Sequence, residues 1–219
     1  NGNYAFDMRY LLDVNLRSDG ASVFGVNNPF STTWSLGIGW NVYNENFLKN
    51  GNVINYFKIR YSLGNPGNQN YDSAQTLLTY AFQYGSMNYF GLGAVLDQVG
   101  NSDLKWQTTL DKNMGIDITL LNKRLNITVD YFHKVTDPLL IRIGMPLSSG
   151  TPTYMTNAGE QTSQGVTATA SYYIIQNFDK RFSWMVRANL RTQKNRIDKI
   201  GDKLSLLNAS GKGANTVRY

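Results

Sequence analysis

The sequence predicts an all-β fold: an antiparallel, up-and-down sheet that forms a segment of a transmembrane β-barrel. Three observations predict this class. Apolar and polar residues alternate with a period of two over long segments, long and short connections alternate, and no apolar run approaches the ~20 residues of a membrane-spanning helix. Only 16% of the 219 residues are charged, against ~25% in an ordinary soluble domain, and the chain is rich in Tyr and Gly.

The first predicted strand covers residues 4–16. Every even position from Tyr4 to Leu16 is apolar, whereas the odd positions include Asp7, Arg9 and Asp13. Alternation at this period favours a strand over a helix. The segment is also much longer than the ~5–6 residues of a typical soluble strand, which favours a membrane-spanning strand.

Six further strands continue the pattern, which makes seven. They are expected over residues 34–42, 57–63, 106–120, 125–131, 166–172 and 182–190. The fourth strand begins at Trp106, and Lys112 interrupts its apolar face. Helices longer than a turn or two are not expected.

The lengths of the connections distinguish the two ends of this sheet. Those over 18–29, 64–105 and 136–163 are long, and those over 44–53, 121–124 and 176–181 are shorter. In an up-and-down meander the short turns then share one end, as periplasmic turns do in outer-membrane barrels, and the first strand runs outward. Aromatic residues flank the short turns, as in an interfacial girdle: Trp40, Tyr43, Tyr56, Phe57, Tyr172, Tyr173, Phe182 and Trp184.

The polar faces of the strands carry charges of both signs. In a barrel these residues would line the lumen: Arg9, Arg17, Lys58, Arg60, Asp111, Asp117, Asp130, Arg187 and Arg191. They could form a substrate path or bind a plug inside the barrel. In a soluble sandwich, by contrast, the apolar faces would form the core.

The sequence does not support a catalytic or metal-binding function. The chain has no Cys and one His, which leaves no metal set, and no pair of carboxylates is singled out for acid–base work. Basic residues are scattered rather than gathered in a nucleic-acid patch. We therefore expect no enzyme, no cofactor and no nucleic-acid partner.

Several motifs occur in collinear order from about residue 4 to 198. They include Leu16-Arg17-Ser18-Asp19-Gly20, Ser35-Leu36-Gly37-Ile38-Gly39-Trp40, Gly64-Asn65-Pro66-Gly67-Asn68, Leu104-Lys105-Trp106-Gln107, Asp130-Tyr131-Phe132 and Asn157-Ala158-Gly159-Glu160. Together these motifs resemble SusC/RagA-type TonB-linked transporters of the outer membrane.

The resemblance implies a plugged barrel of about 22 strands, of which this chain would supply about a third. Residues 1–219 would then be a partial TonB-dependent receptor barrel from its C-terminal half, without plug domain, TonB box or closing strands. The implied location is the outer membrane of a Gram-negative, Bacteroidetes-like cell. The implied partners are a SusD-like surface lipoprotein, TonB acting through the plug, outer-membrane lipid, and a glycan or peptide cargo.

The connection over 64–105 is the candidate contact region on the outer side. It carries an aromatic set, Tyr71, Tyr80, Phe82, Tyr84, Tyr89 and Phe90, among several Asn and Gln residues. Aromatic faces stack on sugar rings and amides bond hydroxyls, so the set could contact a sugar, but it could equally dock a lid partner or pack within the loops.

The predicted function is import of oligosaccharides or peptides by a TonB-dependent transporter with a SusD-like lid. A passive porin-like barrel shares the strand pattern and remains an alternative. A soluble carbohydrate-binding β-sandwich is the other alternative.

Overall fold

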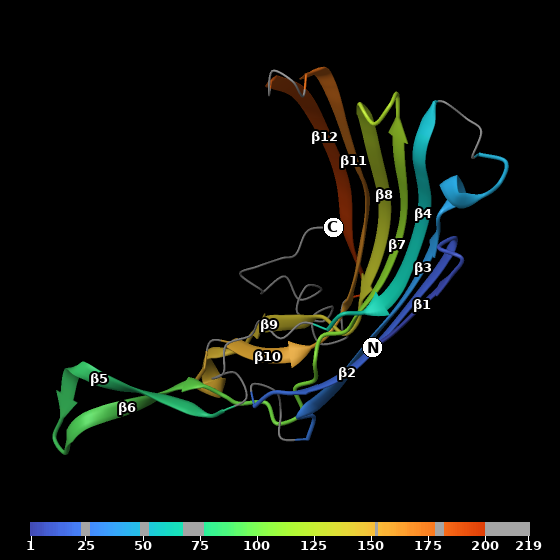
Figure 1. Ribbon diagram of the computed structural model, residues 1–219. Coiled ribbons are helices and arrows are strands. Elements are labelled where there is room, and N and C mark those ends of the chain that lie inside the picture. The colour runs from blue at the N-terminus through green and yellow to red at the C-terminus, as the bar shows by residue number, and fades with distance from the viewer. Residues whose placement is uncertain (23–26, 49–52, 68–76, 152, 178–181, 200–219) are drawn as a thin grey trace.

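A single curved sheet dominates the computed structural model, which describes residues 1–22, 27–48, 53–67, 77–151, 153–177 and 182–199 (Figure 1). Its strands follow the order β1-β2-β3-β4-β7-β8-β11-β12, and every neighbouring pair is antiparallel. Their bounds are β1 Gly2–Phe6, β2 Tyr10–Gly20, β3 Phe30–Trp40, β4 Ile54–Asn65, β7 Thr109–Leu120, β8 Leu125–Thr136, β11 Glu160–Asn177 and β12 Phe182–Lys199.

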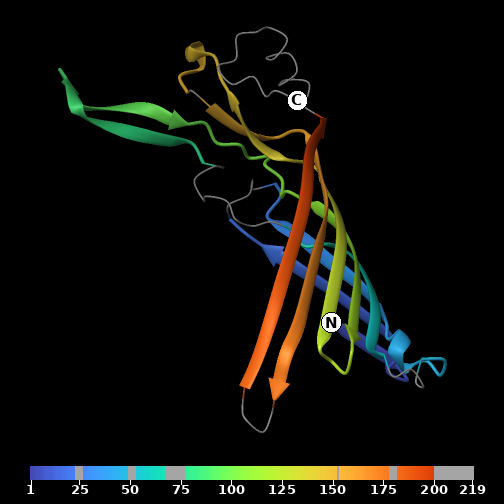
Figure 2. The same cartoon turned by 90° about the horizontal axis from the view of Figure 1, so that it is seen from above.

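Two small hairpins lie outside this sheet, within the long connections. They pair β5 (Thr79–Asn88) with β6 (Gly91–Gln98), and β9 (Leu140–Gly144) with β10 (Thr153–Asn157). The described helical residues are the short 3₁₀ segments Val42–Asn44 and Leu147–Ser149. Figure 2 shows both hairpins at one end of the sheet and the β7–β8 turn at the other. The expected all-β antiparallel class is thus confirmed.

The segment over 4–16 differs from the prediction, because it is a hairpin rather than one strand. Asp7 and Met8 both have positive φ, and the Arg9 amide donates to the Phe6 carbonyl at 2.9 Å. Phe6 pairs with Tyr10, so even-numbered residues keep the same face through the turn. Alternation therefore cannot distinguish this hairpin from a long strand, and the sheet has eight strands instead of seven. It is β2 that runs toward the long connections.

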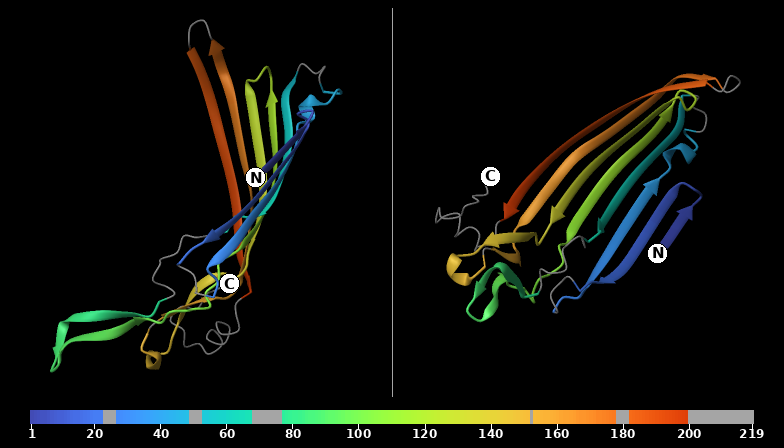
Figure 3. Two further views of the ribbon diagram at one scale, coloured as in Figure 1. Left: turned by 60° about the horizontal axis from the view of Figure 1, so that its bottom comes forward. Right: turned by 90° about the vertical axis from the view of Figure 1, so that its left-hand side faces the viewer.

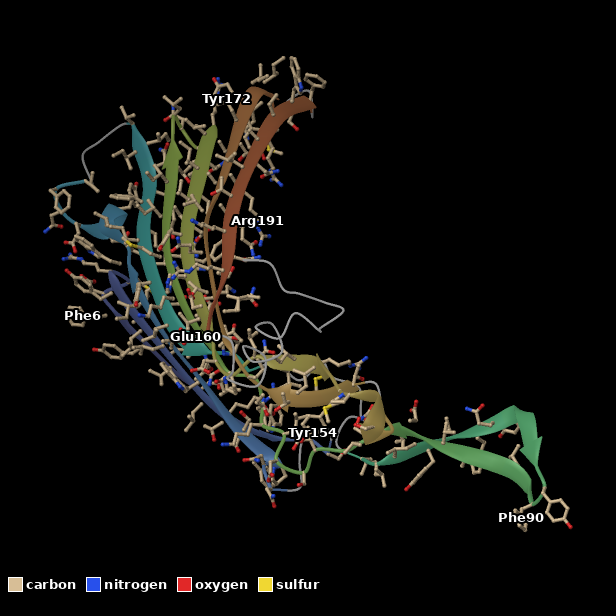
Figure 4. All side chains as sticks on the ribbon, turned by 180° about the vertical axis from the view of Figure 1, so that it is seen from behind. Phe6, Phe90, Tyr154, Glu160, Tyr172 and Arg191 are labelled. Atoms are coloured by element: carbon tan, nitrogen blue, oxygen red, sulfur yellow. The ribbon has the colours of Figure 1, made fainter. Side chains whose placement is uncertain are left out.

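The register aligns apolar side chains into rows across the sheet. One row follows directly from the pairings and crosses seven strands: Tyr10, Trp40, Ile59, Ile116, Val129, Ala168 and Leu190. Figure 3 shows these strands side by side in one layer. On the stick view, Phe6 lies on the convex side of the sheet, whereas Arg191 lies on the concave side (Figure 4). One face of the layer is therefore apolar and the other polar.

The best buried side chains lie in the loops beside the hairpins rather than in the sheet. Leu104 is 1% exposed and Trp106 4% exposed. Trp106 precedes β7 and donates its ring N–H to the Asn28 carbonyl at 3.1 Å, so the prediction that it begins the strand was wrong. The amide of Asn101 donates to the Met155 carbonyl on β10 at 3.0 Å. The long connections thus pack on one another.

The β1–β2 turn offers a test of its left-handed backbone. A non-glycine residue there costs about 1 kcal/mol or more, so Met8→Gly should stabilise the protein by about 1 kcal/mol. The measurement is the temperature at which the complete protein in detergent loses its compact gel mobility. Met114→Gly on β7 is the matched control and should lower that temperature, because it removes a side chain from a strand. A lower temperature for Met8→Gly than for the wild-type protein would contradict the left-handed backbone of this turn.

Candidate functional site

Arg60 on β4 holds the main ion network of the polar face. Its Nε donates to Asp117 Oδ2 on β7 at 2.6 Å, and its Nη2 donates to Asp130 Oδ1 on β8 at 2.8 Å. Thr128 adds a hydroxyl bond to Asp117 at 3.0 Å. Both carboxylates and the guanidinium are half-buried, and one side chain joins three strands. Three of the residues expected on the lumenal face thus lie together.

Gly115 makes this network possible. It lies between Arg60 and Asp130 in the cross-strand row, so the guanidinium passes over its backbone. A Cβ at this position would lie 2.5 Å from Asp130 Oδ1 and 2.7 Å from Arg60 Cζ, which is closer than real Cβ contacts. The absence of a side chain on β7 therefore allows a cation on β4 to reach an acid on β8.

A second cluster lies on the same face, toward the long connections. Lys134 on β8 pairs with Asp111 on β7 at 2.7 Å, and its ammonium lies 5.9 Å from the centre of the Phe132 ring. The Arg191 guanidinium lies 6.0 Å from that ring. Phe132 is only 8% exposed and its ring covers Gly165 on β11, where a Cβ would lie 2.7 Å from Cζ. An aromatic ring over a glycine shields the exposed strand backbone.

The remaining expected lumenal residues share the polar parity, and of these only Arg191 contributes to either cluster, through its position near the Phe132 ring. Lys58 is the register partner of Asp117, and its stem lies over Gly39. Arg187 and Arg191 lie on β12, opposite Ser171 and Thr167. Two others lie outside the middle of the sheet. Arg9 is in the β1–β2 turn and contacts Asp7 and Glu45, whereas Arg17 is largely exposed and pairs with Asp19 at 2.6 Å.

The β5–β6 hairpin carries five of the six aromatic residues expected in the contact region. Tyr80, Phe82 and Tyr84 alternate along β5 and are exposed, and the tip residues Tyr89 and Phe90 are 96% and 94% exposed. The two tip rings pack edge to face with centroids 5.3 Å apart. Figure 4 shows Phe90 at the far end of the hairpin, away from the sheet. Tyr71 lies outside the described residues.

Sequence reasoning missed three residues of this architecture. Phe132 and Gly115 interrupt the expected polar face, and only cross-strand register gives them a role. Glu45 lies beyond β3 and joins the short-turn end, because its carboxylate accepts hydrogen bonds from Arg9, Tyr10 and the Trp40 ring.

Neither a candidate metal site nor a membrane-spanning helix is found among the described residues. They contain no group of three or more His, Asp or Glu side chains that could hold a metal ion. Nor does any helix in that part of the chain have the length and apolarity needed to cross a membrane.

Comparison with known proteins decides the family. The family model described as "TonB dependent receptor-like, beta-barrel" matches residues 1–217. The chain belongs to this family of TonB-dependent receptor barrels. The predicted resemblance is confirmed, and the soluble sandwich is excluded. The family consists of outer-membrane transporters and receptors rather than enzymes.

Named relatives of this chain are themselves TonB-dependent receptors. It is 32% identical to TonB-dependent receptor P39 of Formosa agariphila over 91% of this chain and 19% of the relative. It is 31% identical to TonB-dependent receptor SusC of Bacteroides thetaiotaomicron over 99% of this chain and 23% of SusC. The chain therefore spans about a fifth of the length of these relatives.

Solved structures agree with the fold of this receptor barrel. The structure of the RagAB peptide transporter matches with a TM-score of 0.80 and 27% identity, over 90% of this chain and 22% of the RagAB chain. The siderophore receptor PirA of Pseudomonas aeruginosa matches with a TM-score of 0.57 at 17% identity. At that identity the likeness to PirA shows the fold alone.

Gly115→Ala tests the crossing of Arg60 over β7. The new methyl group should displace the guanidinium and break its contact with Asp130, which should lower the free energy of unfolding by about 1–2 kcal/mol. Gly37→Ala is the matched control, because a Cβ there meets Asp13 only at 3.5 Å, an ordinary contact. Thermal unfolding of the complete receptor in detergent measures both. Equal unfolding temperatures for the two variants would contradict the crossing of Arg60 over β7.

Proposed function

We propose that the chain forms part of the barrel wall of a TonB-dependent transporter that imports oligosaccharides or peptides across the outer membrane. The observation that carries this proposal is the one-layer sheet with one apolar and one charged face. The likeness to SusC and to the RagAB peptide transporter supports the cargo classes and a SusD-like surface lipoprotein as lid.

The apolar face is the side that meets lipid. Side chains such as Leu16, Phe6 and Leu190 are 70%, 58% and 62% exposed, and they belong to rows that continue across the sheet. An apolar surface of this size is a liability in water, whereas hydrocarbon stabilises it at roughly 25 cal/mol per Å². Outer-membrane lipid is therefore a partner of the convex face.

The polar face is the lumenal wall. Arg60, Asp117 and Asp130 satisfy one another, so this part of the wall needs no further ligand to neutralise it. Arg187 and Arg191 make no ion pair with the described residues, although Arg191 bonds Gln193. These arginines on β12 are the groups best placed to contact a plug or an anionic part of the cargo.

The exposed hairpin β5–β6 is the cargo or lid contact. Its aromatic residues project from the end that carries the long connections, which is the extracellular end of an outer-membrane barrel. TonB would act through a plug domain on the periplasmic side. The barrel wall itself would bind and guide cargo without chemistry.

Uptake by the complete transporter tests the proposal. Cells that express it should accumulate a labelled oligosaccharide or oligopeptide, and a protonophore or loss of TonB should abolish the accumulation. Uptake that persists under both conditions would instead support the passive porin. Detection of the complete protein in the soluble fraction, without heat-modifiable gel mobility, would overturn both readings.

Substitution at the hairpin tip tests the contact role. Tyr89→Ala combined with Phe90→Ala should weaken binding of cargo or lid by at least about 30-fold, because aromatic anchors contribute about 1–2 kcal/mol each at interfaces. Phe47→Ala is the control, since Phe47 is 71% exposed but lies beyond β3 at the short-turn end. Calorimetric titration with the lipoprotein, glycans and peptides provides the measurement. Unchanged affinity for all of them would argue against the hairpin.

A further inference from the structure

A polar row crosses the mostly apolar face of the sheet. Lys112 on β7 pairs with His133 on β8, His133 pairs with Gln164 on β11, and Gln164 pairs with Lys194 on β12. All four have the parity of the apolar face, and Leu63 on β4 adjoins Lys112. Lys112, Gln164 and Lys194 are exposed. In the sequence, Lys112 is a single polar residue that interrupts an apolar strand face. The strand register shows that it begins a stripe of polar residues across four strands.

The stripe lies in the outer part of the apolar band, with Leu110 and Val135 in the next row outward. His133 follows Leu125, at the short-turn end of β8, by eight residues. At ~3.3 Å per residue and a tilt of ~40°, the stripe lies about 20 Å above that end, close to the ~25 Å height of a barrel's lipid-facing band. Tyr61 and Tyr131 lie in the row just inside the stripe, where an interfacial aromatic belt is expected.

No acidic side chain in the described part of the chain neutralises the cations of this stripe. Neither Lys112 nor Lys194 forms an ion pair with a described residue. The acids nearest in sequence to Lys112, Asp111 and Asp117, lie on the opposite face and pair with Lys134 and Arg60. On the apolar face near β12, Asp198 is held by Arg196 and by the Thr162 hydroxyl.

The donors suit a phosphate group in both charge and spacing. Lys112 and Lys194 lie three strand steps apart, which is about 14 Å between their backbones, and two lysine stems can converge over that distance. His133 and Gln164 lie between the two lysines and offer a ring N–H and a side-chain amide as further donors. A lysine ammonium is a point charge with three donors, which binds phosphate without a fixed geometry.

We propose that this stripe, Lys112, His133, Gln164 and Lys194, binds the phosphate of an anionic lipid headgroup in the outer leaflet. The inference rests on the proposed function, because that function turns the apolar face toward lipid and the stripe toward the cell exterior. A lipid source fits better than a soluble anion, because the adjoining row carries Met114 on β7, Tyr131 on β8 and Val166 on β11, and these apolar side chains would receive the acyl chains. The bound lipid would fix the height of the wall in the membrane.

Native mass spectrometry of the complete transporter in detergent tests the stripe. The probes are monophosphoryl lipid A and the same glycolipid without its phosphate. The wild-type protein should prefer the phosphorylated form, and Lys112→Gln combined with Lys194→Gln should reduce its affinity about fivefold for each lysine removed. The affinity for the unphosphorylated form should not change.

Lys123→Gln is the matched control. It removes the same charge from the β7–β8 hairpin, but at the exposed short turn on the opposite side of the membrane. Its lipid affinity should equal that of the wild type. Equal binding of both glycolipids by the wild-type protein would overturn the proposal without requiring any variant, as would full binding by the double variant. Uptake of cargo is measured separately, so failure of the stripe remains distinct from failure of the transport function.

Discussion

Lateral backbone hydrogen bonding within one layer is the constraint on which the structure depends. No second sheet covers either face in the described part of the chain, so each strand satisfies its N–H and C=O groups through its neighbours. Membrane-spanning chains require such pairing, because hydrocarbon offers no alternative partner. Side chains of opposite parity then meet different media. A register slip of one residue would turn Arg60, Asp117 and Asp130 to the apolar face.

The turns preserve this register. The β1–β2 turn pairs Phe6 with Tyr10, and the β7–β8 turn pairs Leu120 with Leu125, so apolar residues face the same side before and after each turn. Irregular pairings occur near Ile54 on β4 and Tyr173 on β11, both at the short-turn end. Bulges at the rim of a sheet can change its twist without disturbing the central rows.

Small residues on the polar face give the wall its internal connections. Gly115 lets Arg60 reach across β7, and Gly165 receives the ring of Phe132 from β8. Side chains that are two strands apart thereby interact, and the charges of Arg60 and Lys134 are balanced by acidic residues on neighbouring strands. The β5–β6 hairpin differs, since its aromatic side chains remain exposed. The wall thus supplies a stable frame, and the hairpin supplies the surface available to another molecule.

The sequence by itself determined the all-β class, the two faces and the alternation of short and long connections, because side-chain alternation is a local property of a strand. It also carried enough family-like motifs to indicate the transporter family. It could not show the β1–β2 turn, since a turn that preserves parity leaves the alternation intact and Asp7-Met8 lacks the usual turn glycine. The hairpins inside the long connections were also missed, although Tyr80, Phe82 and Tyr84 alternate along β5.

Only the tertiary structure decided which residues act together. The pairing of Arg60 with Asp117 and Asp130 joins positions 57 and 70 residues apart, and no spacing along the chain indicates it. Trp106 has the parity expected of an apolar strand position, yet burial among the loops determines its role. Lys112 changes from an isolated interruption to part of a stripe once the register of β7, β8, β11 and β12 is known. Cross-strand neighbours are set by hydrogen bonding between strands, which a linear pattern does not contain.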